Sequence, residues 1–187
     1  MNAPLKAVHF EDPIASHVRT MLAELGEDVH REGLAQTPAR YAKAMRYLAG
    51  GYEDSVESVV GNGVFAAEGG GVVAVRDIEF HSLCEHHLLP FYGTVHVGYL
   101  PSRRIIGLSK IPRLVDLFAR RFQVQERLTE QVADALVDVL EPEGVVVIAE
   151  ARHLCMQMRG VQKQHSSTVT RATRGEFAEI LEVMRGS

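Results

Sequence analysis

Tryptophan is absent from the 187-residue sequence, and aromatic residues make up only 6% of it. So few aromatics leave little material for the stacking platforms that bind single-stranded nucleic acids. The formal net charge of −4 gives no electrostatic basis for holding a polyanion along an extended surface. We therefore expect no nucleic-acid partner.

Long apolar runs are also missing. No stretch approaches the roughly 18–20 apolar residues needed to cross a bilayer, and residues 1–12 contain no apolar core of a signal peptide. The sequence has only two cysteines, and thiols kept reduced fit a reducing compartment. We expect a cytoplasmic protein without a membrane partner.

The periodicity of apolar residues predicts an α+β protein. Helices are expected at residues 14–25, 37–48, 109–121, 125–140 and 176–184, and strands at residues 72–80, 92–100, 105–108, 145–149 and 166–173. A glycine-rich stretch at residues 52–71 is interpreted as a connection. It divides an N-terminal helical region, residues 1–66, from the main body, residues 67–187, and we expect the two to work as one unit.

Both cysteines stand close to histidines, as metal ligands commonly do. Cys84 and His87 are three residues apart, which places them on one side of a tight loop or turn, whereas Cys155 must arrive from distant sequence. Two thiolates and one imidazole make a three-ligand zinc site with an open fourth position, as in catalytic zinc sites. Two alternatives stay open: inert buried thiols, and a closed structural site with His86 or His153 as fourth ligand.

His86 and His153 each neighbour an expected ligand. A histidine titrates near neutral pH and could transfer protons beside a metal site. The alternative is a hydrogen bond that only orients the metal ligands.

Basic residues suggest an anion site. Lys110, Arg113 and Arg159 flank the same expected elements, and residues 109–110 open a helix, where free N–H groups favour anions. For each of them, a solvated surface position is the simpler interpretation. Glu126 could stabilise a helix N-terminus or accept two N–H groups from a purine or pterin edge, and the residues alone do not decide between these.

Four linked motifs resemble the GTP cyclohydrolase I family. They are CEHHLLPF at residues 84–91, IGLSKI at 106–111, QVQERLT at 123–129, and HLCM with MRGV between residues 153 and 161. They occur in the family's order with compatible spacing, and the resemblance covers residues 37–174. A departure lies at residues 162–165, Gln-Lys-Gln-His, where a Lys-Pro-Gly-like segment is frequent.

The resemblance implies a tunnelling fold: an antiparallel four-stranded sheet with two helices between its second and third strands, preceded by N-terminal helices. It also implies a toroidal homodecamer of two pentamers, with active sites shared between neighbouring chains. The implied reaction is zinc-dependent hydrolysis and rearrangement of GTP to 7,8-dihydroneopterin triphosphate and formate, the first step of tetrahydrofolate biosynthesis.

The resemblance also implies roles for individual residues. Zinc would be held by Cys84, His87 and Cys155, and its bound water would attack C8 of the guanine. His86 would act as general acid with His153 assisting, and Ser109 would relay a proton. The substrate-binding residues implied are Gln125 and Glu126 for the guanine and Lys110, Arg113, Arg159 and Arg40 for the triphosphate, with Arg40 reaching in from a neighbouring subunit.

Three competing functions are less compatible with the residues. The nitrile reductase of the queuosine pathway needs a cysteine nucleophile and a nicotinamide, whereas both cysteines here occupy metal-type positions. The HxE…PCxxC signature of zinc deaminases is absent. A zinc-stabilised binding module would leave His86 and Glu126 dispensable.

Overall fold

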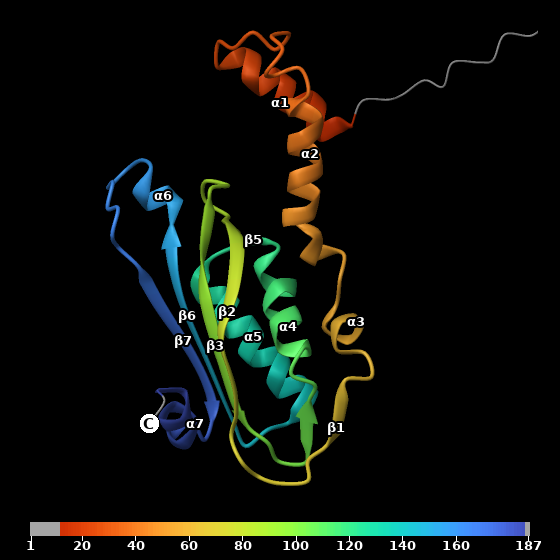
Figure 1. Cartoon of the computed structure of the whole chain (residues 1–187), viewed down its shortest axis with the longest axis vertical. Coiled ribbons are helices and arrows are strands. Elements are labelled where there is room, and N and C mark those ends of the chain that lie inside the picture. Colours follow the sequence, from red (N-terminus) through yellow and green to blue (C-terminus); the bar gives the residue numbers. More distant parts are fainter. Residues whose placement is uncertain (1–11, 186–187) are drawn as a thin grey trace, which may run out of the picture. The chain divides into compact units, whose positions relative to one another are not determined.

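The computed structural model describes residues 12–185, and it confirms the α+β class (Figure 1). The chain divides between Tyr47 and Leu48 into two compact units. The predicted boundary at residue 66, between a helical region and a catalytic domain that work as one unit, stays a prediction. Among the described residues, no helix combines the length and apolarity that crossing a membrane requires.

The N-terminal unit contains two helices, α1 (Pro13–Glu24) and α2 (Thr37–Leu48), close to their predicted positions. Asp12 begins α1, since its side chain accepts a hydrogen bond from the Ile14 amide at 2.9 Å. The same carboxylate accepts hydrogen bonds from Arg46 of α2 at 3.0–3.1 Å. These hydrogen bonds from the Arg46 guanidinium lower the pKa of the Asp12 carboxyl.

The predicted connection at residues 52–71 contains short elements that composition concealed. They are the 3-10 turn η1 (Gly50–Tyr52), helix α3 (Val56–Val60) and strand β1 (Val64–Ala66). β1 pairs antiparallel with β4 (Arg104–Ile106) in a separate two-stranded sheet. The prediction that residues 105–108 continue the main sheet is therefore wrong, because three-residue strands are too short to show a period.

The main sheet has the strand order β5-β2-β3-β6-β7. Its antiparallel strands are β2 (Val73–Cys84), β3 (Pro90–Leu100), β6 (Gly144–His153) and β7 (Thr168–Gly175), and the two-residue β5 (Phe122–Gln123) adds a parallel edge beside β2. Four of the five strands pair antiparallel, and the sequence did not reveal the fifth, β5. Helices α4 (Lys110–Ala119) and α5 (Gln125–Leu140) lie between β3 and β6 in the chain.

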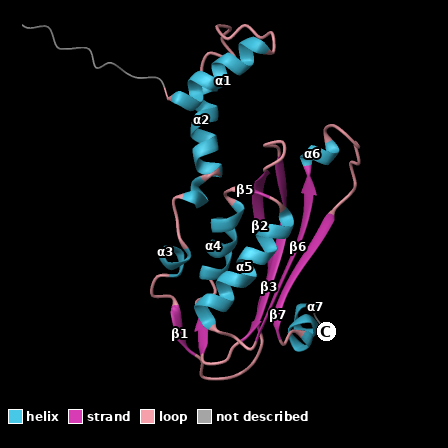
Figure 2. Ribbon diagram, turned by 180° about the vertical axis from the view of Figure 1, so that it is seen from behind, coloured by secondary structure: helices cyan, strands magenta, loops and turns pink. Residues whose placement is uncertain are grey.

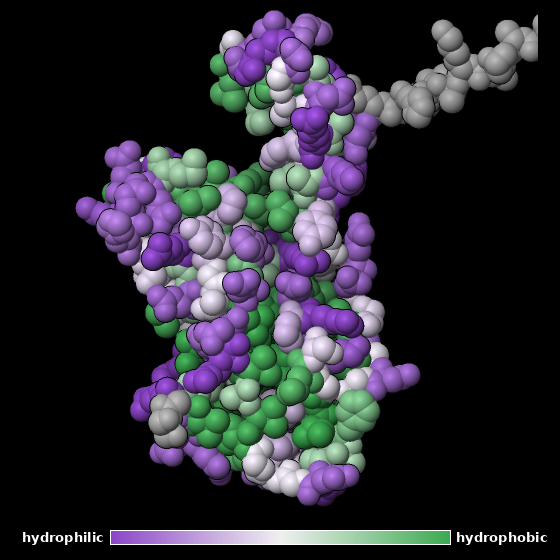
Figure 3. All heavy atoms as spheres, viewed as in Figure 1, coloured by the Kyte–Doolittle hydropathy of each residue, from purple (hydrophilic) through white to green (hydrophobic). Residues whose placement is uncertain are grey.

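The two faces of the sheet carry different helices. α4 and α5 cover one face (Figure 2), where the strand residues Val95 and Val97 and the helix residues Leu114 and Leu136 are fully buried. The short α7 (Ala178–Arg185) packs on the other face, in an apolar cluster formed by Leu100, Val146, Ile180 and Met184. Figure 3 shows apolar surface over the lower part of the sheet, with hydrophilic residues above it.

β2 contains a bulge between Val75 and Ile78, where its register against β3 shifts. Asp77 lies in the bulge with a left-handed φ of 57°, which is uncommon for a residue other than glycine. The bulge reverses the alternation of faces, so that Arg76 lies on the α7 face and Ile78 joins the core on the helix-covered face.

Candidate active site

The β2–β3 hairpin loop carries three of the expected site residues. Cys84 ends β2, and its carbonyl accepts hydrogen bonds from the amides of His87 at 3.3 Å and Leu88 at 2.8 Å. Leu88 has a φ of 55°, which closes this single helical turn. The turn holds Cys84 and His87 on one side, as their three-residue spacing predicted, and leaves His86 exposed between them.

Strand pairing brings the distant cysteine to this loop. Phe91, at the start of β3, pairs with His153, the last residue of β6, and the short helix α6 (Leu154–Gln157) that follows carries Cys155. The hairpin, β5 and α6 consequently lie at one end of the sheet (Figure 1). The sulfurs of Cys84 and Cys155 and a ring nitrogen of His87 all lie within 4.8 Å of one another.

This donor set fits zinc. Zn–S and Zn–N bonds of about 2.0–2.3 Å place tetrahedral ligand atoms roughly 3–4 Å apart, so small side-chain movements would close the group on an ion. Both cysteines are free thiols. Burial and the neighbouring Cys84 raise the pKa of the Cys155 thiol, because a buried thiolate close to a second sulfur lacks compensating charge until a cation is present.

Arg159 reaches the metal-type group from the loop after α6. Its guanidinium lies 2.8 Å from Nε2 of His87 and is exposed on its outer side. An arginine here places a permanent positive charge beside the metal-type group, where it could bind an anionic group.

His153 is held from two sides. Its ring stacks on Phe91 with centroids 4.7 Å apart and planes 2° from parallel. Its Nε2 lies 2.8 Å from Oε1 of the buried Gln125. The amide nitrogen of Gln125 donates to the carbonyls of Ala149 at 3.0 Å and Thr168 at 2.9 Å.

These contacts assign the proton of the imidazole. Two carbonyl acceptors fix which end of the Gln125 amide is nitrogen, so its oxygen faces His153 and must accept a hydrogen from Nε2. Burial lowers the pKa of His153, with the charge of Glu126 opposing that effect. The neutral ring therefore carries its proton on Nε2 and leaves Nδ1 as an acceptor.

A pocket of about 240 Å³ joins these groups. It is lined by two expected metal ligands, four further expected site residues and their neighbours: Cys84, Cys155, His86, Gln125, Glu126, His153, Gln123, Val124, Met156 and Thr168. Glu126 is exposed at the first turn of α5, so its carboxylate is accessible from the pocket. The structure thus gathers most of the predicted residues at one place.

Sequence reasoning missed the partner of Glu85. The Glu85 carboxylate receives two hydrogen bonds from Arg127, at 2.6 and 3.0 Å, and the Arg127 guanidinium lowers the pKa of that carboxyl. This fork joins the hairpin loop to the first turns of α5. The only available signal was the position of Arg127 directly after Glu126, which gives no hint of a pair 42 residues apart.

Three predicted residues lie elsewhere in the unit. Ser109 and Lys110 begin α4 beside β4. The helix is about 15 Å long, and its other end is the one that leads to β5 and the pocket. Lys110 donates to the Val59 carbonyl at 3.0 Å, and Arg113 is exposed on the first turn of α4. Arg40 is exposed on α2, in the N-terminal unit. Within one chain, none of them lines the pocket at Cys84.

Comparison with known proteins agrees with the motifs. The sequence profile of GTP cyclohydrolase I matches residues 14–185. The chain belongs to this family. Family membership identifies it as an enzyme.

Individual relatives share about half of its residues. GTP cyclohydrolase 1 of Deinococcus radiodurans is 54% identical over 100% of this chain and 91% of its own length. The enzyme of that name from Saccharomyces cerevisiae is 56% identical over 88% of this chain and 68% of its own. Among solved structures, an archaeosine synthase QueF-Like in the apo form aligns at a TM-score of 0.49, with 16% identity, over 58% of this chain and 98% of its own.

Proposed function

We propose that the protein hydrolyses and rearranges GTP to 7,8-dihydroneopterin triphosphate and formate, the first step of tetrahydrofolate biosynthesis. The observation that supports this most directly is the pocket lined by both cysteines of the Cys-Cys-His group, two further histidines and Glu126. The names of the relatives support GTP as the substrate.

Cys84, His87 and Cys155 would hold a zinc ion, because two thiolates and an imidazole are the ligands it prefers. Zinc, when bound, acidifies water and so makes hydroxide available for hydrolysis near neutral pH. His86 stands beside this group, with Nδ1 3.8 Å from the Cys84 sulfur and with an exposed ring. An imidazole so placed can protonate the purine nitrogen as the five-membered ring opens at C8, which is the general-acid role.

His153 complements His86 by remaining neutral. Its Nε2 proton is engaged with Gln125, so its free Nδ1 can accept a proton or a hydrogen bond from a reacting group. Gln125 therefore acts by setting this tautomer. Both of its amide protons are used by carbonyl oxygens, so its side chain has no donor left for a guanine.

Glu126 then becomes the residue that anchors the guanine. A carboxylate accepts two parallel hydrogen bonds, which suits the adjacent N1–H and exocyclic amino group of the base. Its place at the first turn of α5, next to Gln125, puts it at the pocket wall that also holds His153.

The triphosphate would be shared between chains. Arg159 contacts His87 of the Cys-Cys-His group. Lys110 and Arg113, with Ser109 before them, form a second group at the N-terminal end of α4. These two groups lie at opposite ends of one subunit, so each is only half of a site. In the proposed decamer of tunnelling-fold subunits, the half-site of one subunit would meet the other half-site of its neighbour. In that shared site, Ser109 would relay a proton and Arg40 would bind the triphosphate from a neighbouring subunit. The proposed location of the protein is the cytoplasm.

The direct test incubates the purified full-length, zinc-loaded protein with GTP. Formate and a pterin that fluoresces after oxidation should form in equal amounts. A protein with stoichiometric zinc that yields neither product would overturn the proposal. Deamination would instead release ammonia without formate.

A further inference from the structure

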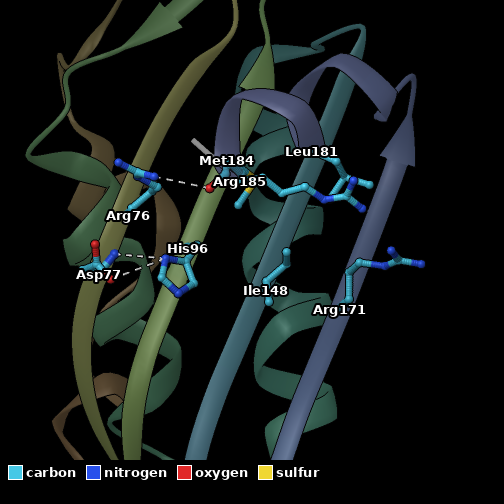
Figure 4. Close-up of a pocket in the computed structure, with 8 residues that line it drawn as sticks. All are labelled: Arg76, Asp77, His96, Ile148, Arg171, Leu181, Met184 and Arg185. Carbon is cyan, nitrogen blue, oxygen red and sulfur yellow. Dashed lines mark hydrogen bonds and ion pairs between the residues drawn. The ribbon is translucent and has the colours of Figure 1, made fainter. Parts of the chain in front are cut away.

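A second pocket lies on the opposite face of the sheet from α4 and α5. His96, Ile148 and Arg171 stand opposite one another on β3, β6 and β7, and therefore share this face. Together with the bulge in β2 and the last turn of α7, they line a pocket of about 280 Å³ (Figure 4). Ile148 is five residues from His153 along β6, about 16 Å, so the pocket is separate from the candidate active site.

The pocket carries an excess of positive charge. Arg76, Arg171 and Arg185 line it, and Asp77 is the only acid among its lining residues. His96 is neutral in this geometry, because its Nδ1 accepts a hydrogen bond from the Asp77 amide at 3.1 Å. Its proton is therefore on Nε2 and is available as a further donor. The Asp77 carboxylate is 79% exposed and 3.9 Å from the same ring nitrogen.

Among the residues that the structure describes, none of the three arginines has an anionic partner. Arg76 donates to the Met184 carbonyl at 3.4 Å, whereas among the described residues Arg171 and Arg185 make no side-chain hydrogen bond or ion pair. Figure 4 shows the Arg185 side chain extending from α7 toward β7, and the Arg171 side chain extending outward from β7. Glu150, on the same face of β6, stands opposite Val169 and does not line the pocket.

A residue on the same strand shows what a paired arginine looks like in this protein. Arg174 lies three positions along β7, on the opposite face, and pairs with Glu130 and with Asp134 of α5 at 2.5 and 2.7 Å. Arg171 faces away from those acids. Guanidinium groups recognise phosphate oxygens through paired N–H donors, and two unpaired ones at one pocket present such donors together.

We propose that this pocket binds a short phosphate chain, either free or as the terminal group of a larger molecule. Arg171 and Arg185 provide the paired donors, the Nε2–H of His96 and Arg76 add further positive or polar contacts, and Ile148 and Leu181 form the apolar wall. The site goes beyond the proposed reaction and uses none of its residues.

The test follows the methyl resonances of Ile148, Leu181 and Met184 in the full-length protein during titration with inorganic pyrophosphate. Binding should shift these three signals. The double variant Arg171→Gln/Arg185→Gln should weaken the effect roughly tenfold or more, because two charge-assisted interactions are lost. Arg174→Gln, which removes an arginine from the same strand but the other face, should leave it unchanged.

A titration with ATP and a measurement of oligomeric mass distinguish the possible ligands from a contact with a second copy of the chain. ATP in place of pyrophosphate should shift the same methyls if the terminal group of a nucleotide is accepted, and pyrophosphate alone should do so if only the free anion fits. Methyl signals that stay fixed in the native protein, or move equally in the double variant, overturn the proposal. Unmoved signals with a changed oligomeric mass in the variant would assign the arginines to contacts with a second copy, which also overturns it.

Discussion

At the residue scale, the chemistry of the site depends on groups whose hydrogen bonds leave little freedom. Gln125 is only 1% exposed, and it connects β6, β7 and His153 through one amide. A buried polar group is expensive to leave unpaired, so its partners hold it in one orientation. That orientation in turn determines which nitrogen of His153 carries the proton.

Gln125→Leu should therefore affect both stability and catalysis. It leaves the carbonyls of Ala149 and Thr168 and the Nε2–H of His153 unpaired, which should lower the free energy of unfolding by about 1–3 kcal/mol. GTP turnover should fall while KM changes less, and ¹⁵N shifts of His153 should show a mixture of tautomers. If the tautomer stays unchanged and only KM rises, Gln125 contacts the guanine instead.

Variants of His86 and Cys155 should distinguish a residue that acts as general acid from one that binds the metal. Cys155→Ser should lose zinc and activity together, because a hydroxyl is a poor replacement for a thiolate. His86→Ser should retain zinc but lose about 10²–10⁴-fold in turnover, the usual contribution of a general acid. Metal analysis of both purified variants beside the formate assay checks this. A His86 variant without zinc would make His86 a ligand.

At the scale of elements, the site exists because β3 and β6 pair in one register. Gly93 faces Ala151 in that pairing, and a Cβ added to Gly93 would lie 1.9 Å from the Glu150 carbonyl oxygen and 2.7 Å from the Ala151 Cα. The glycine therefore allows the two strands to approach closely near the end that carries His153 and Cys155.

Gly93→Ala should destabilise the fold by at least about 1–3 kcal/mol, since backbone atoms must move. Gly70→Ala is the matched control: nothing lies within 4 Å of its added Cβ, so its effect should stay within about 0.5 kcal/mol. Urea unfolding of both variants measures the difference. Equal stability of the two would show that the strands can separate without cost.

The stability of the N-terminal helices should decrease at low pH. The pKa of Asp12 is lowered in the folded state by its hydrogen bond with Arg46. A carboxylate with a depressed folded pKa contributes stability above its unfolded value of 3.8, and that contribution is lost as the pH falls through the folded pKa. Hydrogen exchange in α1 should accelerate below about pH 4, and Asp12→Asn should remove this dependence. An unchanged profile in the variant would assign it to other acids.

At the scale of the whole molecule, the isolated chain leaves surfaces that a neighbour could cover. In the part of the chain that the structure describes, no strand pairs with the outer edge of β7. The side chains of Met158, Val161 and Val169 are 61–62% exposed. Unpaired edges and exposed apolar groups favour association.

We expect the protein in solution to have a mass near ten times the 20.7 kDa of the chain. Light scattering after size-exclusion chromatography measures this. Because the proposed half-sites come from different subunits, mixing an Arg113→Ala variant with a Cys155→Ser variant should restore part of the activity that each lacks. A fully active monomer would contradict the shared site.

Residue types and their spacing were enough to predict the donor chemistry of the site. Two cysteines near histidines, at a three-residue spacing in one motif, predicted the three potential ligands that the fold brings together. Long periodic segments such as α2 and α5 were also readable, because their own apolar spacing specifies them. Short elements such as β1 and β5 were not, since too few residues carry the pattern.

The contacts between the side chains could not be predicted in this way, because they depend on how distant parts of the chain pack. The Glu85–Arg127 fork, the tautomer of His153 and the position of Lys110 away from the pocket all depend on strand register and helix direction. The same holds for the second pocket, whose three arginines lie on β2, β7 and α7. Residue type limits what a group can bind, but contacts between residues far apart in the chain determine what it does bind.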